Sequence, residues 1–134
     1  MTLDEMLGIL VWTGAGAVLL IVLMAIDSFF TRYKDLEEIK KGNVAVTSRF
    51  IMKLLAQAYI LAQSISSSDH LGDALLASVI SFVILLLIES LVEVALRSTV
   101  SLDLGEGTKE GKMSHALLAG SLHVAGALVI GSCL

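Results

Sequence analysis

Four long apolar segments alternate with polar stretches along the chain. They cover residues 6–26, 44–65, 74–96 and 113–134. An α-helix rises 1.5 Å per residue and a membrane hydrocarbon core is about 30 Å thick, so about 20 apolar residues cross it. The pattern therefore predicts an all-α membrane protein with four transmembrane helices.

The polar stretch after the first span contains a short amphipathic segment. Residues 35–41 favour a surface helix, supported by Glu37 and Lys41 at a spacing of four residues. Gly42 is a residue type that ends helices, and Asn43 is one that caps the next helix. The stretch is thus expected to lead directly into the second span.

The two remaining connections differ in kind. Residues 66–73 form a short turn, which makes the second and third spans antiparallel neighbours. Residues 98–112 contain three glycines, and we expect them to form a polar loop without an element of its own. The chain should therefore consist of two helical hairpins.

Basic residues are concentrated in two of the polar stretches. The N-terminal tail and the turn at 66–73 have none, and the basic residues of the other stretches are Arg32, Lys34, Lys40, Lys41, Arg97, Lys109 and Lys112. Basic loops stay on the cytoplasmic side of a membrane. This asymmetry predicts that both termini face outward.

The two hairpins align with each other at an offset of 69 residues. Residues 40–43 align with residues 109–112, and each of these four-residue segments precedes an apolar helix. We therefore interpret the chain as one transmembrane domain, 1–134, made of repeat units at about 6–65 and 74–134. Because each unit has an even number of spans, the units would share one orientation, related by a two-fold axis along the membrane normal.

Charged residues interrupt the second and third spans. Arg49 and Lys53 are four residues apart, as are Glu89 and Glu93, so each pair lies on one helix face. In an antiparallel hairpin centred near Leu71, Arg49 comes level with Glu93 and Lys53 with Glu89. We predict these two ion pairs, because charged groups in a membrane interior are usually paired.

Two further polar residues fall at a similar depth. Asp27 lies near the inner end of the first helix and His123 lies ten residues into the last. The predicted cluster thus has members from all four spans. It fits either a structural clamp that selects helix register or an ion or proton pathway using Glu89, Lys53 and His123. Glu93 has an alternative partner in Arg97, four residues along the same helix.

Composition narrows the possible functions. Hydrophobic residues make up 56% of the 134 residues, charged residues 16%, and the net charge is −4. Motifs for nucleophilic, metal-dependent or nucleotide chemistry do not occur, so we expect no enzyme activity, no cofactor and no metal. The nine Lys and Arg form no nucleic-acid patch, and one cysteine excludes an internal disulfide.

Small residues gather in the first and last spans. Such residues let helices approach closely in a membrane. The last span can use this face against its own chain or against a second copy, and we expect a homo-oligomer in the lipid bilayer. The glycines selected for helix packing are Gly14, Gly16, Gly120, Gly126 and Gly131.

The stretch Glu38-Ile39-Lys40-Lys41-Gly42-Asn43-Val44-Ala45, with an echo at Gly111, resembles the DUF350 family, also called UPF0719 transmembrane proteins. The motif residues are Glu38, Gly42, Asn43 and Gly111; Lys112 stands where the family usually has asparagine. The resemblance implies a small multi-pass protein of the bacterial inner membrane, built from two hairpins. It implies no biochemical activity, only a loose link to membrane maintenance and stress-response partners.

Overall fold

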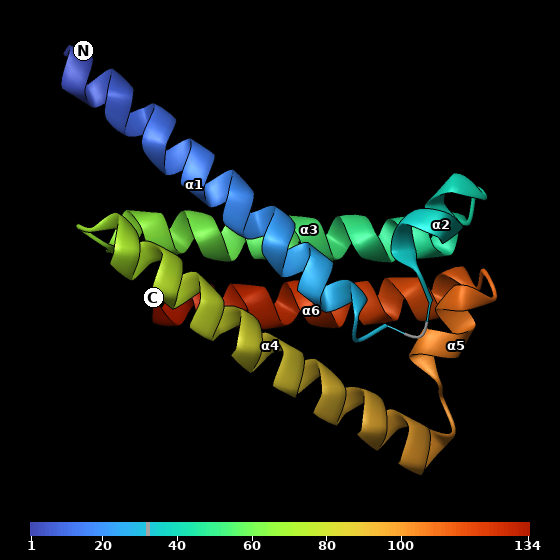
Figure 1. Cartoon of the computed structure of the whole chain (residues 1–134). Coiled ribbons are helices and arrows are strands. Elements are labelled where there is room, and N and C mark those ends of the chain that lie inside the picture. The colour runs from blue at the N-terminus through green and yellow to red at the C-terminus, as the bar shows by residue number, and fades with distance from the viewer. Residues whose placement is uncertain (32) are drawn as a thin grey trace.

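The computed structural model describes residues 1–31 and 33–134, which form six helices joined by short connections (Figure 1). Arg32, one of the basic residues used to predict orientation, lies outside the described residues. The helices are α1 (Leu3–Ser28), α2 (Asp35–Lys40), α3 (Val44–Ser67), α4 (Leu71–Val100), α5 (Leu104–Lys109) and α6 (Met113–Cys133).

Four of these helices are long and apolar enough to cross a membrane: α1, α3, α4 and α6. They match the four predicted spans, although α4 begins three residues earlier and ends four residues later than predicted. Local signals explain two of the starts. Thr2 and Glu5 form a capping box at the start of α1, and the Asn43 side chain accepts a hydrogen bond from the Val46 N–H at the start of α3.

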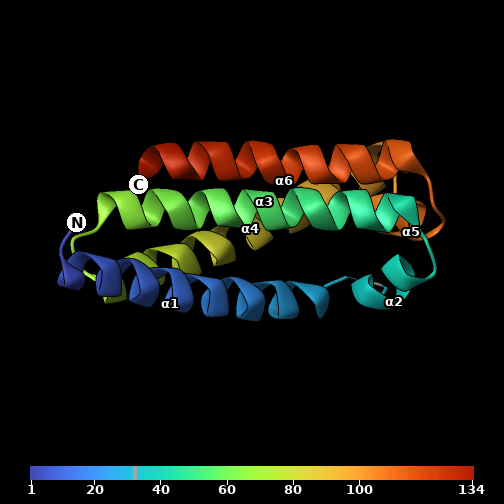
Figure 2. The same ribbon diagram turned by 90° about the horizontal axis from the view of Figure 1, so that it is seen from above.

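The helices α3 and α6 form the most extensively packed pair of the molecule. These two helices lie side by side and run in the same direction, while α1 and α4 run the opposite way and cross them at an angle (Figures 1 and 2). A small apolar core joins α3, α4 and α6, made of Ala56, Ile60, Leu85, Ala127 and Ile130. The first helix packs more loosely, and large apolar side chains along it are exposed.

The two short helices lie at the end of the molecule opposite both termini (Figure 1). The presence of α5 contradicts the prediction of a loop without an element at residues 98–112. The three glycines of residues 98–112 indicated a loop, but Asp103 caps α5 by accepting a hydrogen bond from the Glu106 N–H. We attribute the helix to this cap, which offsets the low helix propensity of the glycines.

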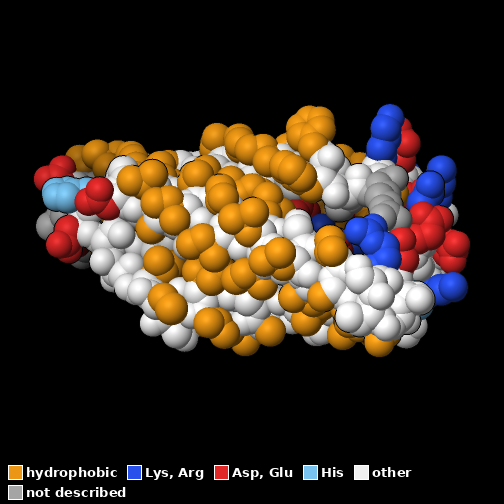
Figure 3. All heavy atoms as spheres, turned by 90° about the horizontal axis from the view of Figure 1, so that it is seen from below, with side chains coloured by type: hydrophobic (Ala, Val, Ile, Leu, Met, Phe, Trp, Pro, Cys, Tyr) orange, Lys and Arg blue, Asp and Glu red, His pale blue; other side chains and the backbone are white. Residues whose placement is uncertain are grey.

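The surface has an apolar band across its middle and a polar region at each end. Figure 3 shows apolar side chains across the middle of one face, with Lys and Arg gathered at the end that carries α2 and α5. At the opposite end the visible charged groups are acidic or histidine. This division is the one expected for a membrane-embedded body with two water-facing ends.

The short helices and the spans after them start at matching positions. The starts of α2 and α5, at 35 and 104, are 69 residues apart, as are those of α3 and α6, at 44 and 113. Gly42 and Gly111 both adopt positive φ, +83° and +87°. The N–H groups of Asn43 and Lys112 donate to carbonyls five residues earlier, at 3.0 and 2.9 Å. Both helix-to-helix corners therefore have the same backbone construction.

Candidate functional site

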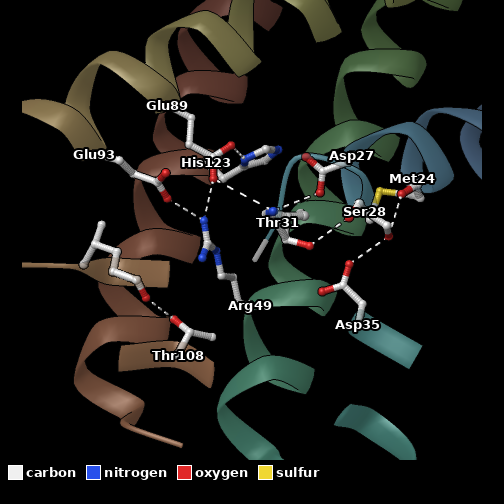
Figure 4. A network of polar contacts seen from close by, with 12 residues as sticks. Met24, Asp27, Ser28, Thr31, Asp35, Arg49, Glu89, Glu93, Thr108 and His123 are labelled. Carbon is white, nitrogen blue, oxygen red and sulfur yellow. Dashed lines mark hydrogen bonds and ion pairs between the residues drawn. The ribbon is translucent and has the colours of Figure 1, made fainter. Parts of the chain in front are cut away.

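One polar cluster, here called the ion-pair network, lies inside the helix bundle (Figure 4). It contains all six residues that were predicted to cluster: Asp27, Arg49, Lys53, Glu89, Glu93 and His123. Asp27 comes from the last turn of α1, the two basic residues from α3, the two glutamates from α4 and His123 from α6. Every spanning helix therefore contributes at least one member.

Arg49 bridges the two glutamates of α4. Its Nη2 donates to Glu89 Oε1 at 2.9 Å and to Glu93 Oε1 at 2.7 Å. The Arg49 side chain is only 5% exposed. The predicted ion pair of Arg49 with Glu93 is thus present. Glu93 pairs with Arg49 of the neighbouring helix α3 instead of with Arg97 of its own helix.

Lys53 binds a different partner from the one predicted first. Its Nζ donates to Asp27 Oδ2 at 2.9 Å and lies 3.9 Å from Glu89 Oε1. The predicted ion pairs were derived from the register of α3 and α4 alone, whereas α1 places Asp27 beside the same lysine. The proposed contact between Lys53 and Glu89 is therefore the longer of two, and the short ion pair joins α3 to α1.

Glu89 is the residue at which three helices meet. Its Oε1 accepts from Arg49 of α3, and its Oε2 lies 2.9 Å from Nδ1 of His123 on α6. An ionised carboxylate only accepts, so in this arrangement the histidine proton lies on Nδ1. The formal charge of the six residues is then −1, and it becomes zero if His123 is protonated.

Two buried residues at the edge of the network come from the connection between α1 and α3, and the sequence pattern did not single them out. Arg49 Nη1 donates to the Tyr33 hydroxyl at 3.3 Å, and the Ser28 hydroxyl donates to Asp35 Oδ2 at 2.8 Å. Asp35 had been assigned to a surface helix, yet it is 5% exposed. Burial raises the pKa of both the Tyr33 phenol and the Asp35 carboxyl, and the Ser28 hydrogen bond opposes part of the rise at Asp35.

A polar cavity of about 70 Å³ adjoins the network. Its wall includes Arg49, Lys53 and Glu89, and also Asp103 and Gly105 from the α5 end. A water molecule occupies about 30 Å³ in the liquid, and a polar cavity of this size has room for water. One side of the network therefore faces a space that water can fill.

Gln57 lies one helical turn beyond Lys53 on the same face of α3. It is 1% exposed, and neither its Nε2 nor its Oε1 has a hydrogen-bond partner among the described residues. Further along the same helix, Ser64 receives a hydrogen bond from Ser78 at 3.3 Å. The composition of α3 did not distinguish Gln57 from other polar residues, because burial without a partner is visible only in three dimensions.

The selected glycines divide into packed and open positions. A Cβ at Gly120 would meet Met52 of α3, one at Gly126 would meet Leu85, and one at Gly131 would meet Tyr59. The small-residue face of α6 is therefore packed within the chain. On α1, a Cβ at Gly16 would lie 3.1 Å from Leu61, whereas Gly14 has nothing within 4 Å.

The sequence motif around Gly42 builds the corner between α2 and α3. The side-chain amide of Asn43 donates to Glu38 Oε2 at 3.2 Å and to the carbonyl of Lys109 at 3.0 Å. It therefore ties α2 and α3 to the end of α5. In the second corner Lys112 provides no side-chain cap, and its Nζ lies 3.2 Å from Glu110.

These features define a class: an all-helical, multi-pass membrane protein with charged residues paired inside its helix bundle. The family described as Domain of Unknown Function (DUF350) matches residues 1–134, and the chain belongs to this family. It is also 31% identical over 84 residues to the UPF0719 transmembrane protein YshE of Bacillus subtilis (strain 168). That alignment spans 63% of this chain and 63% of the relative. No solved structure matches the chain.

Proposed function

We propose that this chain is a non-enzymatic protein of the bacterial inner membrane whose ion-pair network fixes the assembly of its helices. In this proposal it serves as an oligomeric scaffold or small subunit of a membrane-maintenance system. One observation carries it: all four spanning helices contribute to the network, and each Asp, Glu, Lys and Arg of the network has an opposite charge within 3.0 Å.

The energetics support a clamp. A charged side chain at the centre of a spanning helix costs about 2.5–3.5 kcal/mol on insertion scales, so an unpaired member would oppose folding. Removing one partner of a buried ion pair typically costs about 3–5 kcal/mol, because the other charge stays buried. The network therefore favours the one arrangement that brings its members together.

We further propose two tandem repeats with both termini outside. The equal spacing of the helix starts and the gathering of Lys and Arg at the α2 and α5 end support this topology. The test uses Asp69→Cys and Glu106→Cys, each in a Cys133→Ser background, with a membrane-impermeant maleimide on intact cells. Asp69→Cys should react at once and Glu106→Cys only after permeabilisation; the opposite pattern would reverse the orientation.

An oligomer would use α1 rather than α6. The small-residue face of α6 is already packed against α3 and α4, whereas Val11 and Val18 of α1 are 57% and 62% exposed. Cross-linking of a single cysteine at Val18 in membranes, again without Cys133, tests this proposal. A cross-linked dimer supports the proposal. No cross-linking at position 18, together with a monomeric mass, opposes it.

Proton or ion conduction is the second candidate, favoured by the polar cavity and by the unpartnered Gln57. In conduction, Glu89 and His123 would exchange a proton on the path, while Lys53 would set the local charge. A path across the whole membrane would also have to pass the apolar contact of Ile60 and Leu85, which are 0% and 1% exposed. This apolar contact is why conduction is placed second.

One experiment separates the two candidates. Purified chain in liposomes is tested for proton flux across a pH gradient, for the natural sequence and for Glu89→Gln, and both proteins are also melted in detergent. A clamp gives no flux above protein-free liposomes and a lower melting temperature for Glu89→Gln. Conduction gives a flux that Glu89→Gln removes while the variant stays folded.

A further inference from the structure

A large cavity lies at the α2 end of the first helix, apart from the ion-pair network. Its volume is about 940 Å³. Its walls come from the end of α1, the connection that follows, α2 and the end of α5. Among the described residues, the charged ones that line it are Lys34, Lys41, Lys109, Asp35, Glu37 and Glu38. Basic and acidic side chains therefore both face this space.

An apolar groove of about 280 Å³ adjoins this cavity. The two share Ala25, Ser28 and Leu36 as wall residues. From there the groove runs between α1 and α3, and its remaining walls are Leu20, Ile21, Met24, Phe50 and Leu54. The nine residues from Leu20 to Ser28 correspond to about 12 Å of helix, which is part of the depth of one membrane leaflet.

The charged side chains of the cavity are weakly held by one another. Lys34 Nζ lies 3.6 Å from Glu37, and Lys41 Nζ lies 3.9 Å from Glu38. The side chains of Lys34 and Lys41 are 79% and 69% exposed. Long, exposed pairs contribute little to stability. A ligand that carries both charges can therefore replace these contacts at small cost.

Two of the acidic residues are already engaged. Asp35 is buried and bound by the Ser28 hydroxyl at 2.8 Å, and Glu38 Oε2 accepts a hydrogen bond from the Asn43 side chain at 3.2 Å. The described charged groups left to contact a ligand are then the three lysines and Glu37. Both signs remain represented among them, which fits a head group that carries a phosphate and an ammonium.

We propose that the cavity and groove bind one phospholipid with a zwitterionic phosphoethanolamine head. Its phosphate lies between Lys41 and Lys109, its ammonium group near Glu37, and one acyl chain in the groove between α1 and α3. The order of polar cavity and apolar groove along α1 matches the order of head group and chain in a leaflet. The site does not depend on whether the ion-pair network is a clamp or a pathway.

The test measures lipid retention by native mass spectrometry on the full chain in detergent. Phosphatidylethanolamine, phosphatidylglycerol and phosphatidylcholine with the same acyl chains are each added to delipidated protein. Phosphatidylethanolamine should be retained most, since its ammonium donates hydrogen bonds that a choline head lacks. Equal retention of all three lipids, or strongest retention of phosphatidylglycerol, would overturn the proposal.

Matched variants locate the site. Lys41→Ala removes a phosphate contact and should weaken phosphatidylethanolamine retention about two- to fivefold, the effect of one exposed ion pair. Ala25→Trp fills the junction of cavity and groove and should abolish retention. The controls are Lys112→Ala and Val22→Trp, which lie outside both walls. Equal loss in the controls would overturn the assignment.

Folding is checked independently of binding. Each variant is melted in lipid-free detergent, and Lys41→Gln replaces Lys41→Ala if the latter is unfolded, since Gln keeps a longer polar side chain. A folded Lys41→Gln that retains phosphatidylethanolamine as well as the natural chain would remove Lys41 from the site and refute the proposed head-group position.

Discussion

Lys53 Nζ lies 2.9 Å from Asp27 Oδ2, and both side chains are less than 5% exposed. This contact joins α3 to α1, a helix that is otherwise loosely packed against the rest of the chain. The position of α1 in the bundle therefore depends heavily on one buried ion pair.

A double-mutant cycle tests this dependence. Asp27→Asn and Lys53→Met should each destabilise the protein by about 3–5 kcal/mol, and the double variant should lose much less than the sum, because neither charge is left alone. The measurement is the free energy of unfolding in detergent. A parallel cycle on Lys53 and Glu89, which are 3.9 Å apart, should give a smaller coupling energy.

The exposed pair Glu110 and Lys112 serves as the control for that cycle. Their charged atoms are 3.2 Å apart, but their side chains are about half exposed. Exposed pairs couple by about 0–1 kcal/mol. A coupling energy for Asp27 and Lys53 no larger than this would show that the buried contact does not hold α1.

Close packing of α6 on α3 gives a second prediction. Gly120→Val should lower the melting temperature, because the added side chain meets Met52; overpacking costs about 1–3 kcal/mol. Gly14→Val, at an open position of α1, is the control and should cost less. Met52→Ala in the Gly120→Val chain should recover part of the loss, and no recovery would place the clash elsewhere.

The spans were predictable from sequence because length and apolar composition alone determine what crosses a membrane. The cluster was predictable for a similar reason, since charges in spans are few and must find one another. The partner of Lys53 was not, because the choice between Asp27 and Glu89 depends on how α1 lies across α3. Spacing along one helix carries no information about that angle.

Other residues were missed because their role depends on burial. Asp35 and Tyr33 follow the first span in a polar stretch, and such residues are usually exposed. The helix α5 was missed because the three glycines of residues 98–112 indicated a loop and Asp103 was not considered as a cap. The predicted alignment at an offset of 69 residues held the missing signal, because it places α5 opposite the short helix that was predicted before α3.

A third prediction concerns pH. Burial raises the pKa of Asp35 in the folded protein, so folding favours the protonated carboxyl. Its contribution to stability is fully present below the unfolded pKa near 4 and is lost as pH rises through the folded pKa. Asp35→Asn cannot ionise and keeps an acceptor for Ser28. The variant should therefore gain in melting temperature over the natural chain as pH rises from 4 to 8.

The control for Asp35 is Glu37→Gln on the exposed side of the same helix, where the side chain is 61% exposed. Melting curves of all three proteins at several pH values make the comparison. If the difference between Asp35→Asn and the natural chain stayed constant over this range, the buried carboxyl would not be titrating as described.

Gln57 gives a fourth prediction. Two unpartnered polar atoms in a buried side chain cost about 1–3 kcal/mol, and leucine has a similar volume without them. Gln57→Leu should therefore raise the free energy of unfolding, and Gln63→Leu, at a half-buried position of α3, should raise it less. A destabilised Gln57→Leu would show that the amide has a partner, such as water continuous with the polar cavity, and would strengthen the case for conduction.

The fifth prediction uses the two matching corners. Asn43 caps α3 with its side chain and also binds the carbonyl of Lys109, whereas Lys112 leaves α6 without a side-chain cap. Asn43→Ala should cost at least the 0.5–2 kcal/mol or so of a lost cap, and Lys112→Asn should gain a cap of similar size. Thermal melting in detergent measures both. Lys112→Ala is the control, because it removes the same lysine without adding a cap; a gain of equal size in this variant would assign the effect to the lost charge instead.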